Sequence, residues 1–325
     1  MQVPAPDHPA SSLRPADTRP AGPASPGPVV RPVRWRERSR LVRWVRLVRT
    51  VRPRTFTQKV RYKMLRDHRP LLVTFADKVA VREHVRATVG EGHLPALHAV
   101  LDDPAGLVGL ELPDRYVMKP SHGSGAVVVV SPGASADARL PEPRWGWVYA
   151  HVRPEAADRD VLARIAAGWL TQLYGQGPNR EWAYGQVPRR VLVEELLSAA
   201  DGGVPDDYKL FVFHQRCRFV QLDGGRFGAR TQDFYSTDWE HLDLSGGPAW
   251  ADPPHPRPDR LDALVVLAEA LAAGTDFLRV DLYVLADRVV VGELTSYPAG
   301  GNSPFEPASW DAEFGRTWRV PRRNR

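Results

Sequence analysis

Lysine is scarce in this chain, although basic residues are not. The 325-residue sequence holds 44 lysine and arginine residues, and only five are lysine, namely Lys59, Lys63, Lys78, Lys119 and Lys209. An ammonium group is a compact point charge and a guanidinium is a flat fork, so the two are not interchangeable at a phosphate site. We therefore expect lysine to remain where it is required, and Lys78, Lys119 and Lys209 lie in settings that suit a phosphate. Lys59 and Lys63 fall in a helix-like stretch just after the tail, and a surface role is expected for them. Random escape from the composition bias is the alternative.

Cysteine and long apolar runs are also nearly absent. The single cysteine, Cys217, excludes an intramolecular disulfide and favours a reducing compartment. No CxxC, HExxH or Cys/His spacing indicates zinc. No stretch approaches eighteen consecutive apolar residues, and no secretory signal opens the chain. The sequence therefore predicts a cytoplasmic protein.

Positive charge is concentrated in an N-terminal tail. Residues 1–55 carry a net charge of +9, which leaves residues 56–325 at about −3. Residues 1–30 are rich in Pro, Ala, Ser and Gly and are expected to be disordered. Residues 31–54 mix ten arginines with Trp, Leu and Val, a composition that an anionic membrane surface attracts, although a solvated arm is an equal alternative. Because the folded part is slightly acidic, no nucleic-acid partner is expected.

The rest of the chain has the pattern of a mixed α/β protein. Apolar residues at helical spacing predict helices over 77–90, 158–175 and 259–273. Short apolar runs predict strands at 116–118, 126–130 and 191–193, a hairpin of 210–213 with 218–222, and a second hairpin of 278–285 with 289–294.

Two carboxylates interrupt the strands of the second hairpin. Asp281 and Glu293 are each flanked by apolar residues, and a buried carboxylate is costly unless it is paired or metal-bound. Carboxylates from adjacent strands can share a Mg²⁺, which prefers oxygen ligands together with nucleotide phosphates. A salt bridge of Asp281 with Arg279 is the alternative.

Two further segments have possible roles in nucleotide binding. His122-Gly123-Ser124-Gly125, between two strands, offers backbone N–H groups that can cap a phosphate, although a plain turn is the simpler interpretation. His122 either caps this turn or orients a substrate. Val193-Glu194-Glu195-Leu196-Leu197 ends an apolar strand with acids, and such an edge can hold an adenine or can be ordinary surface.

In this order the segments resemble the TupA-like family of ATP-grasp proteins, which is linked to teichuronopeptide synthesis. The resemblance covers roughly residues 54–320. It is carried by Arg54-Thr55-Phe56-Thr57-Gln58-Lys59, Phe75-Ala76-Asp77-Lys78, Tyr116-Val117-Met118-Lys119-Pro120 with the glycine segment, Arg180-Glu181-Trp182, Val193-Glu194-Glu195, Asp206-Asp207-Tyr208-Lys209, Phe219-Val220-Gln221-Leu222-Asp223 with Arg226-Phe227, Arg279-Val280-Asp281-Leu282-Tyr283 and Gly292-Glu293-Leu294-Thr295.

The resemblance implies an ATP-grasp fold, in which two α/β lobes hold ATP between them. We predict a tail at 1–55, an N-terminal helical and α/β region at 56–115, a small lobe with the glycine loop at 116–190, and a large lobe with the metal site at 191–325. The acceptor region is expected in the least patterned stretches, 131–160 and 224–258.

The resemblance also implies roles for individual residues. Lys78 and Lys119 would reach the nucleotide phosphates, beneath a loop of Gly123, Ser124 and Gly125. Adenine would be held by Glu194 and by the backbone of Glu195 and Leu197. Lys209 would face the phosphates or an acyl phosphate, and Arg226 and Arg279 would stabilise the phosphoryl group in flight. Asp281 and Glu293 would bind Mg²⁺, with Thr295 where many ATP-grasp enzymes carry Asn.

The implied activity is that of an ATP-dependent carboxylate–amine ligase. Its partners would be ATP, Mg²⁺, a carboxylate-bearing glycan or peptide of the cell envelope and an amine donor, and its arginine-rich tail would touch the inner leaflet. A kinase on the same fold and a glycosyltransferase are the rival enzymes. The glycosyltransferase motif would be Asp158-Arg159-Asp160, which is more simply explained as charge at a helix N-terminus. A non-enzymatic binder acting through the tail is the third rival.

Overall fold

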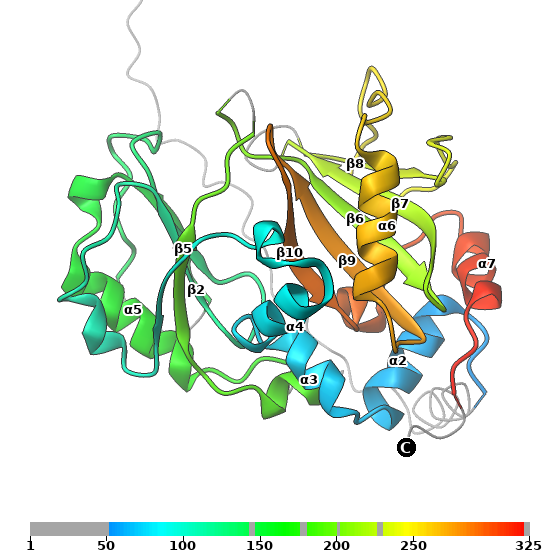
Figure 1. Cartoon of the computed structure of the whole chain (residues 1–325), viewed down its shortest axis with the longest axis horizontal. Coiled ribbons are helices and arrows are strands. Elements are labelled where there is room, and N and C mark those ends of the chain that lie inside the picture. Colours follow the sequence, from blue (N-terminus) through cyan, green and yellow to red (C-terminus); the bar gives the residue numbers. More distant parts are fainter. Residues whose placement is uncertain (1–51, 143–146, 176–180, 200–201, 226–229, 322–325) are drawn as a thin grey trace, which may run out of the picture. The chain divides into compact units, whose positions relative to one another are not determined.

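The fold is built on two five-stranded sheets with helices packed against them (Figure 1). The computed structural model describes residues 52–142, 147–175, 181–199, 202–225 and 230–321, all within one compact unit of the chain. The predicted tail lies outside the described residues, except for residues 52–55. None of the described helices is long and apolar enough to cross a bilayer.

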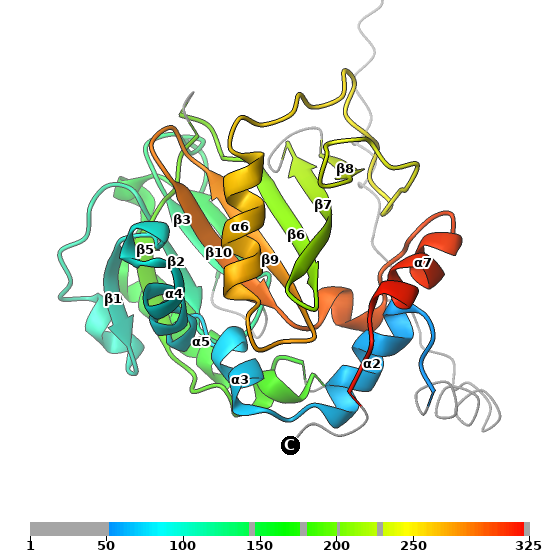
Figure 2. The ribbon, with the colours of Figure 1, turned by 45° about the vertical axis from the view of Figure 1, so that its right-hand side comes forward.

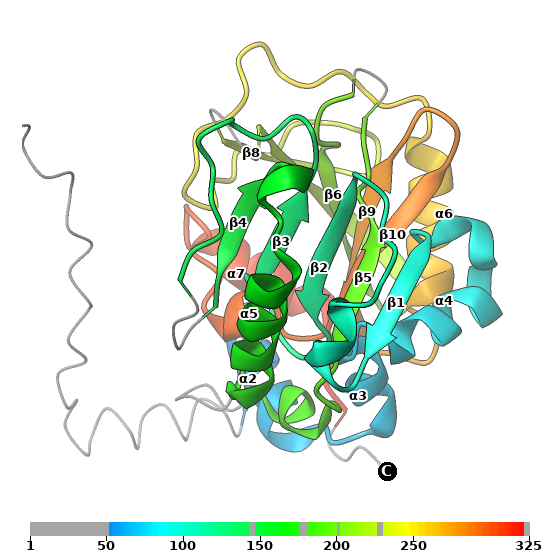
Figure 3. The same ribbon diagram turned by 90° about the vertical axis from the view of Figure 1, so that its left-hand side faces the viewer.

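The first sheet has the strand order β1-β5-β2-β3-β4. Its strands are β1 (Leu97–Leu101), β5 (Val191–Glu195), β2 (Tyr116–Pro120), β3 (Val127–Val130) and β4 (Tyr149–Val152), and only the β3–β4 pair is parallel. Helix α5 (Arg159–Thr171) packs on one face, where Trp169 is fully buried (Figure 3). Because side chains alternate along a strand, Met118 of β2 points into this core and Lys119 points to the opposite face.

The first sheet draws its strands from three of the predicted segments. A boundary after residue 115 would separate β1 from β2–β4, and a boundary after residue 190 would separate β5. Strand β5 nevertheless pairs with both β1 and β2. Strand β5 is therefore the second strand from one edge of the first sheet, and the second sheet begins at residue 207.

The second sheet is antiparallel throughout. It contains β10 (Val289–Thr295), β9 (Phe277–Val284), β6 (Asp207–Phe213), β7 (Arg216–Gly224) and β8 (Thr231–Tyr235) in that order. Helix α6 (Leu261–Leu271) crosses one face (Figure 2). The other face changes character along β6, where Phe211 and Phe213 pack against Phe56 of α2 (Phe56–Arg66), and Lys209 and Asp207 follow on the same side.

The remaining elements connect and cover the sheets. They are α3 (Pro70–Ala76), α4 (Ala80–Val89), α7 (Ser309–Thr317) and the short 3-10 turns η1 (Glu91–His93), η2 (Pro104–Leu107), η3 (Pro154–Ala156), η4 (Trp182–Gln186) and η5 (Pro298–Gly301).

The expected helices and strands are confirmed as elements, with shifted ends. Helix α4 ends at Val89 and is followed by Gly90. The φ of Gly90 is +98°, a conformation that glycine adopts more readily than other residues. Helix α5 ends at Thr171, before the predicted residue 175. Asp158 caps this helix by accepting a hydrogen bond from the backbone N–H of Val161 at 2.9 Å, as the helix-terminus interpretation of Asp158-Arg159-Asp160 requires.

Two lysines expected at the surface are structural. Lys63 is buried between Asp67 at 2.7 Å and Asp276 at 2.6 Å, and Trp318 Nε1 donates to Asp276 at 2.8 Å. Lys59 donates to the backbone carbonyl of Gly315 at 2.7 Å. The expected surface role was wrong because Asp276 and Gly315 are distant in sequence and only the fold brings them to α2.

Candidate active site

The glycine segment packs against aromatic rings and against Lys78. The Lys78 side chain donates to the carbonyl of Gly123, and the Lys78 backbone N–H donates to Ser121 at 3.1 Å. A Cβ on Gly123 would lie 2.9 Å from the Trp147 ring and 3.2 Å from the Tyr174 ring, so this position requires glycine. Burial lowers the pKa of Lys78.

The other loop residues differ in exposure. Ser124 and Gly125 are exposed, and Gly125 has a φ of +86°. His122 is buried, with Nε2 3.2 Å from the carbonyl of Gln172 at the end of α5. This contact attaches the loop to α5 and favours the turn-capping role for His122.

Lys119 and Glu194 form an ion pair on the face of the first sheet that α5 leaves uncovered. Glu194 is buried and also lies 3.6 Å from the guanidinium of Arg82 on α4. The backbone N–H of Glu195 already donates to Ala96 at 2.8 Å, and its side chain binds Arg288. The Glu194 carboxylate is thus placed to orient Lys119.

The two carboxylates expected to bind metal lie opposite each other on β9 and β10. Glu293 pairs with Asp281 because the register shifts between Val291 and Glu293, which leaves Gly292 as an extra residue. A bulge of this kind re-aims a side chain, here bringing Glu293 onto the face of Asp281. A Cβ on Gly292 would lie 2.5 Å from the Tyr283 ring.

Arg279 binds the Asp281 carboxylate in a fork. Its Nε donates to Oδ1 at 2.7 Å and its Nη2 to Oδ2 at 2.6 Å, so the salt bridge considered as the alternative to a metal is present. Arg279 also donates to Thr295 Oγ1 at 3.1 Å and lies 3.8 Å from Glu293. Burial raises the pKa of Asp281 to about 6, although Arg279 and Lys209 act in the opposite direction.

The oxygen atoms of Asp281, Glu293 and Thr295 suit a Mg²⁺ ion that is bound together with a nucleotide. No group of three histidine, cysteine or acidic side chains is placed to hold a metal within the described ranges. Two in-register carboxylates and a hydroxyl match an ion that takes one or two protein carboxylates and completes its shell with phosphates and water. The residues therefore suit a nucleotide-bound Mg²⁺ better than a resident metal.

Lys209 lies among carboxylates in the middle of the second sheet. It is opposite Asp281 on β9, it bonds Asp207, and it lies 3.0 Å from Asp223 of β7. Burial lowers the pKa of Lys209, but Asp281, Asp207 and Asp223 outweigh it and raise the pKa above its usual range. Asp207 and Asp223 belong to the segments that carry the family resemblance, but the sequence assigned them no role. Only strand pairing places them beside Lys209.

Four cations act electrostatically on Glu293, three from the two sheets and Lys78 from the turn between α3 and α4. Burial raises its pKa, but Lys78, Arg279, Lys209 and Lys119 hold it below its usual range. The structure thus brings together Lys78, Lys119, Lys209, Arg279, Asp281, Glu293 and Thr295. Arg226 lies outside the described residues.

Glu181 is an acidic residue at this site that sequence reasoning left without a role. It is 9% exposed, and its backbone N–H donates to Gly175 at 2.8 Å. Burial and the charge of Glu293 raise its pKa to about 7. The Tyr174 ring, next along the chain to Gly175, lies edge-on to Tyr184 at 4.8 Å. The signal available in the sequence was the Arg180-Glu181-Trp182 segment.

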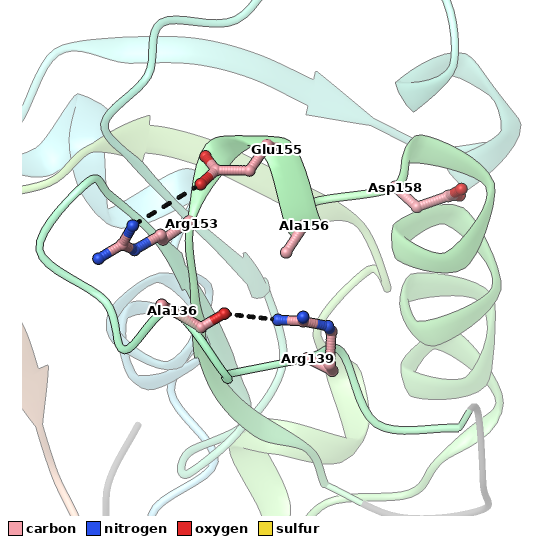
Figure 4. Close-up of a pocket in the computed structure, with 6 residues that line it drawn as sticks. All are labelled: Ala136, Arg139, Arg153, Glu155, Ala156 and Asp158. Carbon is pink, nitrogen blue, oxygen red and sulfur yellow. Dashed lines mark hydrogen bonds and ion pairs between the residues drawn. The ribbon is translucent and has the colours of Figure 1, made fainter.

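A cavity of about 520 Å³ lies elsewhere on the first sheet (Figure 4). It is lined by Ala136, Arg139, Arg153, Glu155, Ala156 and Asp158. These residues follow the ends of β3 and β4, whereas the glycine loop precedes β3. The cavity falls within the stretch 131–160 expected to bind an acceptor, but it contains none of the residues that converge on Glu293.

Lysines beside a glycine loop, together with in-register carboxylates, are a set of groups that suits a nucleotide. The chain belongs to the TupA-like ATP-grasp family, whose model matches residues 58–319. A search of curated proteins gives no match.

Several solved ligase structures are similar at low identity. The ATP-grasp ligase PsnB, complexed with a minimal precursor, is 14% identical, with a TM-score of 0.37 over 70% of this chain and 54% of that one. D-alanine–D-alanine ligase from Helicobacter pylori is 13% identical, with a TM-score of 0.39 over 77% and 60%. L-amino acid ligase from Bacillus licheniformis is 12% identical, with a TM-score of 0.43 over 80% and 55%. The match thus spans little more than half of each solved chain.

Proposed function

We propose that this chain is an ATP-dependent carboxylate–amine ligase that forms an amide through an acyl phosphate. The observation that carries the proposal is the convergence of Lys78, Lys119, Lys209 and Arg279 on Glu293, itself paired in register with Asp281. Four cations around paired carboxylates suit the charge of nucleotide phosphates and Mg²⁺. Family membership supports ATP as the nucleotide.

The proposed reaction has two steps. A substrate carboxylate oxygen attacks the γ-phosphorus of ATP, the bond to ADP breaks, and an acyl phosphate forms. The nitrogen of an amine then attacks the acyl carbon, the bond to phosphate breaks, and the nitrogen loses a proton. Both steps need positioning and charge stabilisation rather than a covalent nucleophile.

The residues divide these tasks between the two sheets. Lys78 and Lys119 hold the phosphates beneath Gly123, Ser124 and Gly125, and Glu194 keeps Lys119 in place. Lys209 and Arg279 neutralise charge on the transferred group, with Arg226 as a further candidate. Adenine would lie against the chain after β5, at the carbonyl of Glu195 and the backbone of Leu197.

The metal donors are Asp281, Glu293 and Thr295. Bound Mg²⁺ would neutralise phosphate charge during the transfer. Each oxygen of Asp281 accepts one hydrogen bond from Arg279 and has a second lone pair, so the carboxylate can bind the ion while this pair is intact. The nearby Glu293 and Thr295 are further partners for the guanidinium.

A covalent thiol mechanism has little support. The single cysteine, Cys217, is buried on β7, and burial raises the pKa of its thiol to about 12. The reactive form of a cysteine is the thiolate, which this environment disfavours.

The biological setting of the proposal comes from the family resemblance. The carboxylate substrate would be a glycan or peptide of the cell envelope, as in teichuronopeptide synthesis. The enzyme would work in the cytoplasm, with its arginine-rich tail against the anionic inner leaflet, where each basic residue contributes about 1 kcal/mol.

Titration of Mg²⁺-ATP into wild type, Lys119→Ala and Glu293→Gln tests the nucleotide site. We expect at least tenfold weaker binding in both variants, with Arg164→Ala, an exposed change on α5, and Glu313→Gln, an exposed change on α7, as controls. Unchanged Mg²⁺-ATP affinity in both site variants would contradict the assignment of these residues to the nucleotide site.

Product analysis separates the proposed ligase from its rivals. ADP with an amide product identifies a ligase, and ADP with a stable phosphoester identifies a kinase. Binding of nucleotide sugars without ATP would identify a glycosyltransferase, although Asp158 of the only Asp-x-Asp segment caps helix α5.

A further inference from the structure

A buried carboxylate without a cation stands beside the proposed site. Glu181 is 9% exposed, yet across the described part of the chain no side chain forms an ion pair or hydrogen bond with its carboxylate. Burying an ionised carboxylate in this way is costly unless a positive partner is supplied. Every other buried acidic residue at the site has a cationic partner, including Glu194 and Asp281.

The position of Glu181 is fixed by close packing. A Cβ on Gly175 would lie 2.9 Å from the Glu181 Cβ and 3.3 Å from its Oε2, so the side chain lies directly over this glycine. The main-chain hydrogen bond from Glu181 to Gly175, at 2.8 Å, holds the two segments together. The carboxylate is therefore held next to Tyr174, which precedes Gly175.

Tyr174 connects this carboxylate to the glycine loop. Its ring is 3.2 Å from the Cβ position of Gly123. Its ring also meets Trp147 at 5.6 Å and Tyr184 at 4.8 Å. Glu181 is thus part of an aromatic wall beside the glycine loop.

Tyr297 adds an unpaired polar group to the same wall. Its side chain is buried, and its hydroxyl has no hydrogen-bond partner among the described residues. The charge of Glu181 is among the causes that raise the pKa of Tyr297, of Tyr174 and of Tyr184. A carboxylate among three tyrosines is a chemistry that recognises a primary ammonium, through an ion pair and the faces of aromatic rings.

We infer that Glu181, with the wall of Tyr174, Tyr184 and Tyr297, binds the primary ammonium group of the amine substrate. The ammonium passes one proton to the Glu181 carboxylate, and the free amine then attacks the acyl carbon. The inference rests on the proposed ligase function and deepens it. The carboxylate substrate is repelled from this wall by Glu181, so it is left to the side of Arg279 and Lys209. Glu181 positions the nitrogen and is not a ligand of the nucleotide.

Ligand-observed NMR tests the inference on the full chain with Mg²⁺-ADP bound. The probes are glycine, L-alanine, L-glutamate, D-glucosamine and 1,3-diaminopropane, each measured beside its hydroxyl counterpart, such as D-glucose for D-glucosamine. We expect wild type to prefer at least one amine by tenfold or more. Glu181→Gln should remove that preference, and Glu181→Asp should restore part of it.

Controls separate loss of the amine site from loss of the fold or of the nucleotide site. Glu313→Gln, the exposed change on α7, should leave every affinity unchanged. Mg²⁺-ATP affinity should stay within twofold of wild type in Glu181→Gln. Absence of Mg²⁺-ATP binding in wild type would refute the proposed function. An unchanged amine preference in Glu181→Gln, or no preference for any amine in wild type, would overturn the inference alone.

Discussion

Glu293 lies opposite Asp281 only because Gly292 adds one residue to β10. Without the bulge, Gly292 would occupy the position opposite Asp281, and Glu293 would point to the face that α6 covers. The proposed metal site therefore depends on a glycine that donates no atom to it.

Substitution of this glycine tests that dependence. Gly292→Ala places a methyl group 2.5 Å from the Tyr283 ring, so we expect a loss of about 1–3 kcal/mol in the free energy of unfolding. We also expect weaker Mg²⁺-ATP binding, because Glu293 is displaced. Urea unfolding and nucleotide titration measure the two effects. Gly109→Ala, where a Cβ would meet nothing within 4 Å, is the matched control.

The buried ion cluster on α2 should dominate stability without affecting nucleotide binding. Lys63→Met removes the ammonium that bridges Asp67 and Asp276 and leaves these two buried carboxylates with Arg69 alone. We expect the free energy of unfolding, measured in urea, to fall by about 3–5 kcal/mol. Arg66→Met changes an exposed residue of the same helix and should cost less than about 0.5 kcal/mol. Equal unfolding midpoints for the two variants would contradict the structural role of Lys63.

Lys119 should depend on Glu194 for its position. Glu194→Gln removes the charge that holds the ammonium, so we predict a three- to tenfold loss of Mg²⁺-ATP affinity. In a double-mutant cycle with Lys119→Met, the two losses should not add, because both act through one contact. Additive losses would show that the two residues act independently.

The titration of Glu181 should appear in the pH dependence of stability. Its pKa is raised to about 7, so in metal-free buffer the folded state holds this proton more tightly than the unfolded chain. Its contribution to stability is then largest at low pH and falls as the pH rises towards 7. Glu181→Gln should match wild type at pH 5 and exceed it by about 2 kcal/mol at pH 8, after allowance for solvent screening. Parallel stability curves in thermal melts would contradict this.

The sequence was informative where apolar runs are local. The hairpin that carries Asp281 and Glu293 follows from two apolar strands and a short turn, and the same hairpin forms in the structure. That the two carboxylates share a face did not follow from their spacing, because one bulge changes which side of the sheet a residue occupies.

Long-range partners were not predictable from the pattern. Lys63 has the context of a surface lysine on α2, and its burial depends on Asp276, which is 213 residues away. The membership of β1 and β5 in one sheet, and the approach of Glu181 to the loop, likewise depend on packing between distant segments. Composition and spacing carry no record of these contacts.

The hydrogen bond from Lys78 to the carbonyl of Gly123 ties a proposed phosphate donor to the glycine loop. An ammonium has three N–H donors, so Lys78 can hold this carbonyl and still donate to a phosphate oxygen. A bound nucleotide would then be joined to the loop through one side chain. Because the Trp147 ring packs against Gly123, its fluorescence should report nucleotide occupancy.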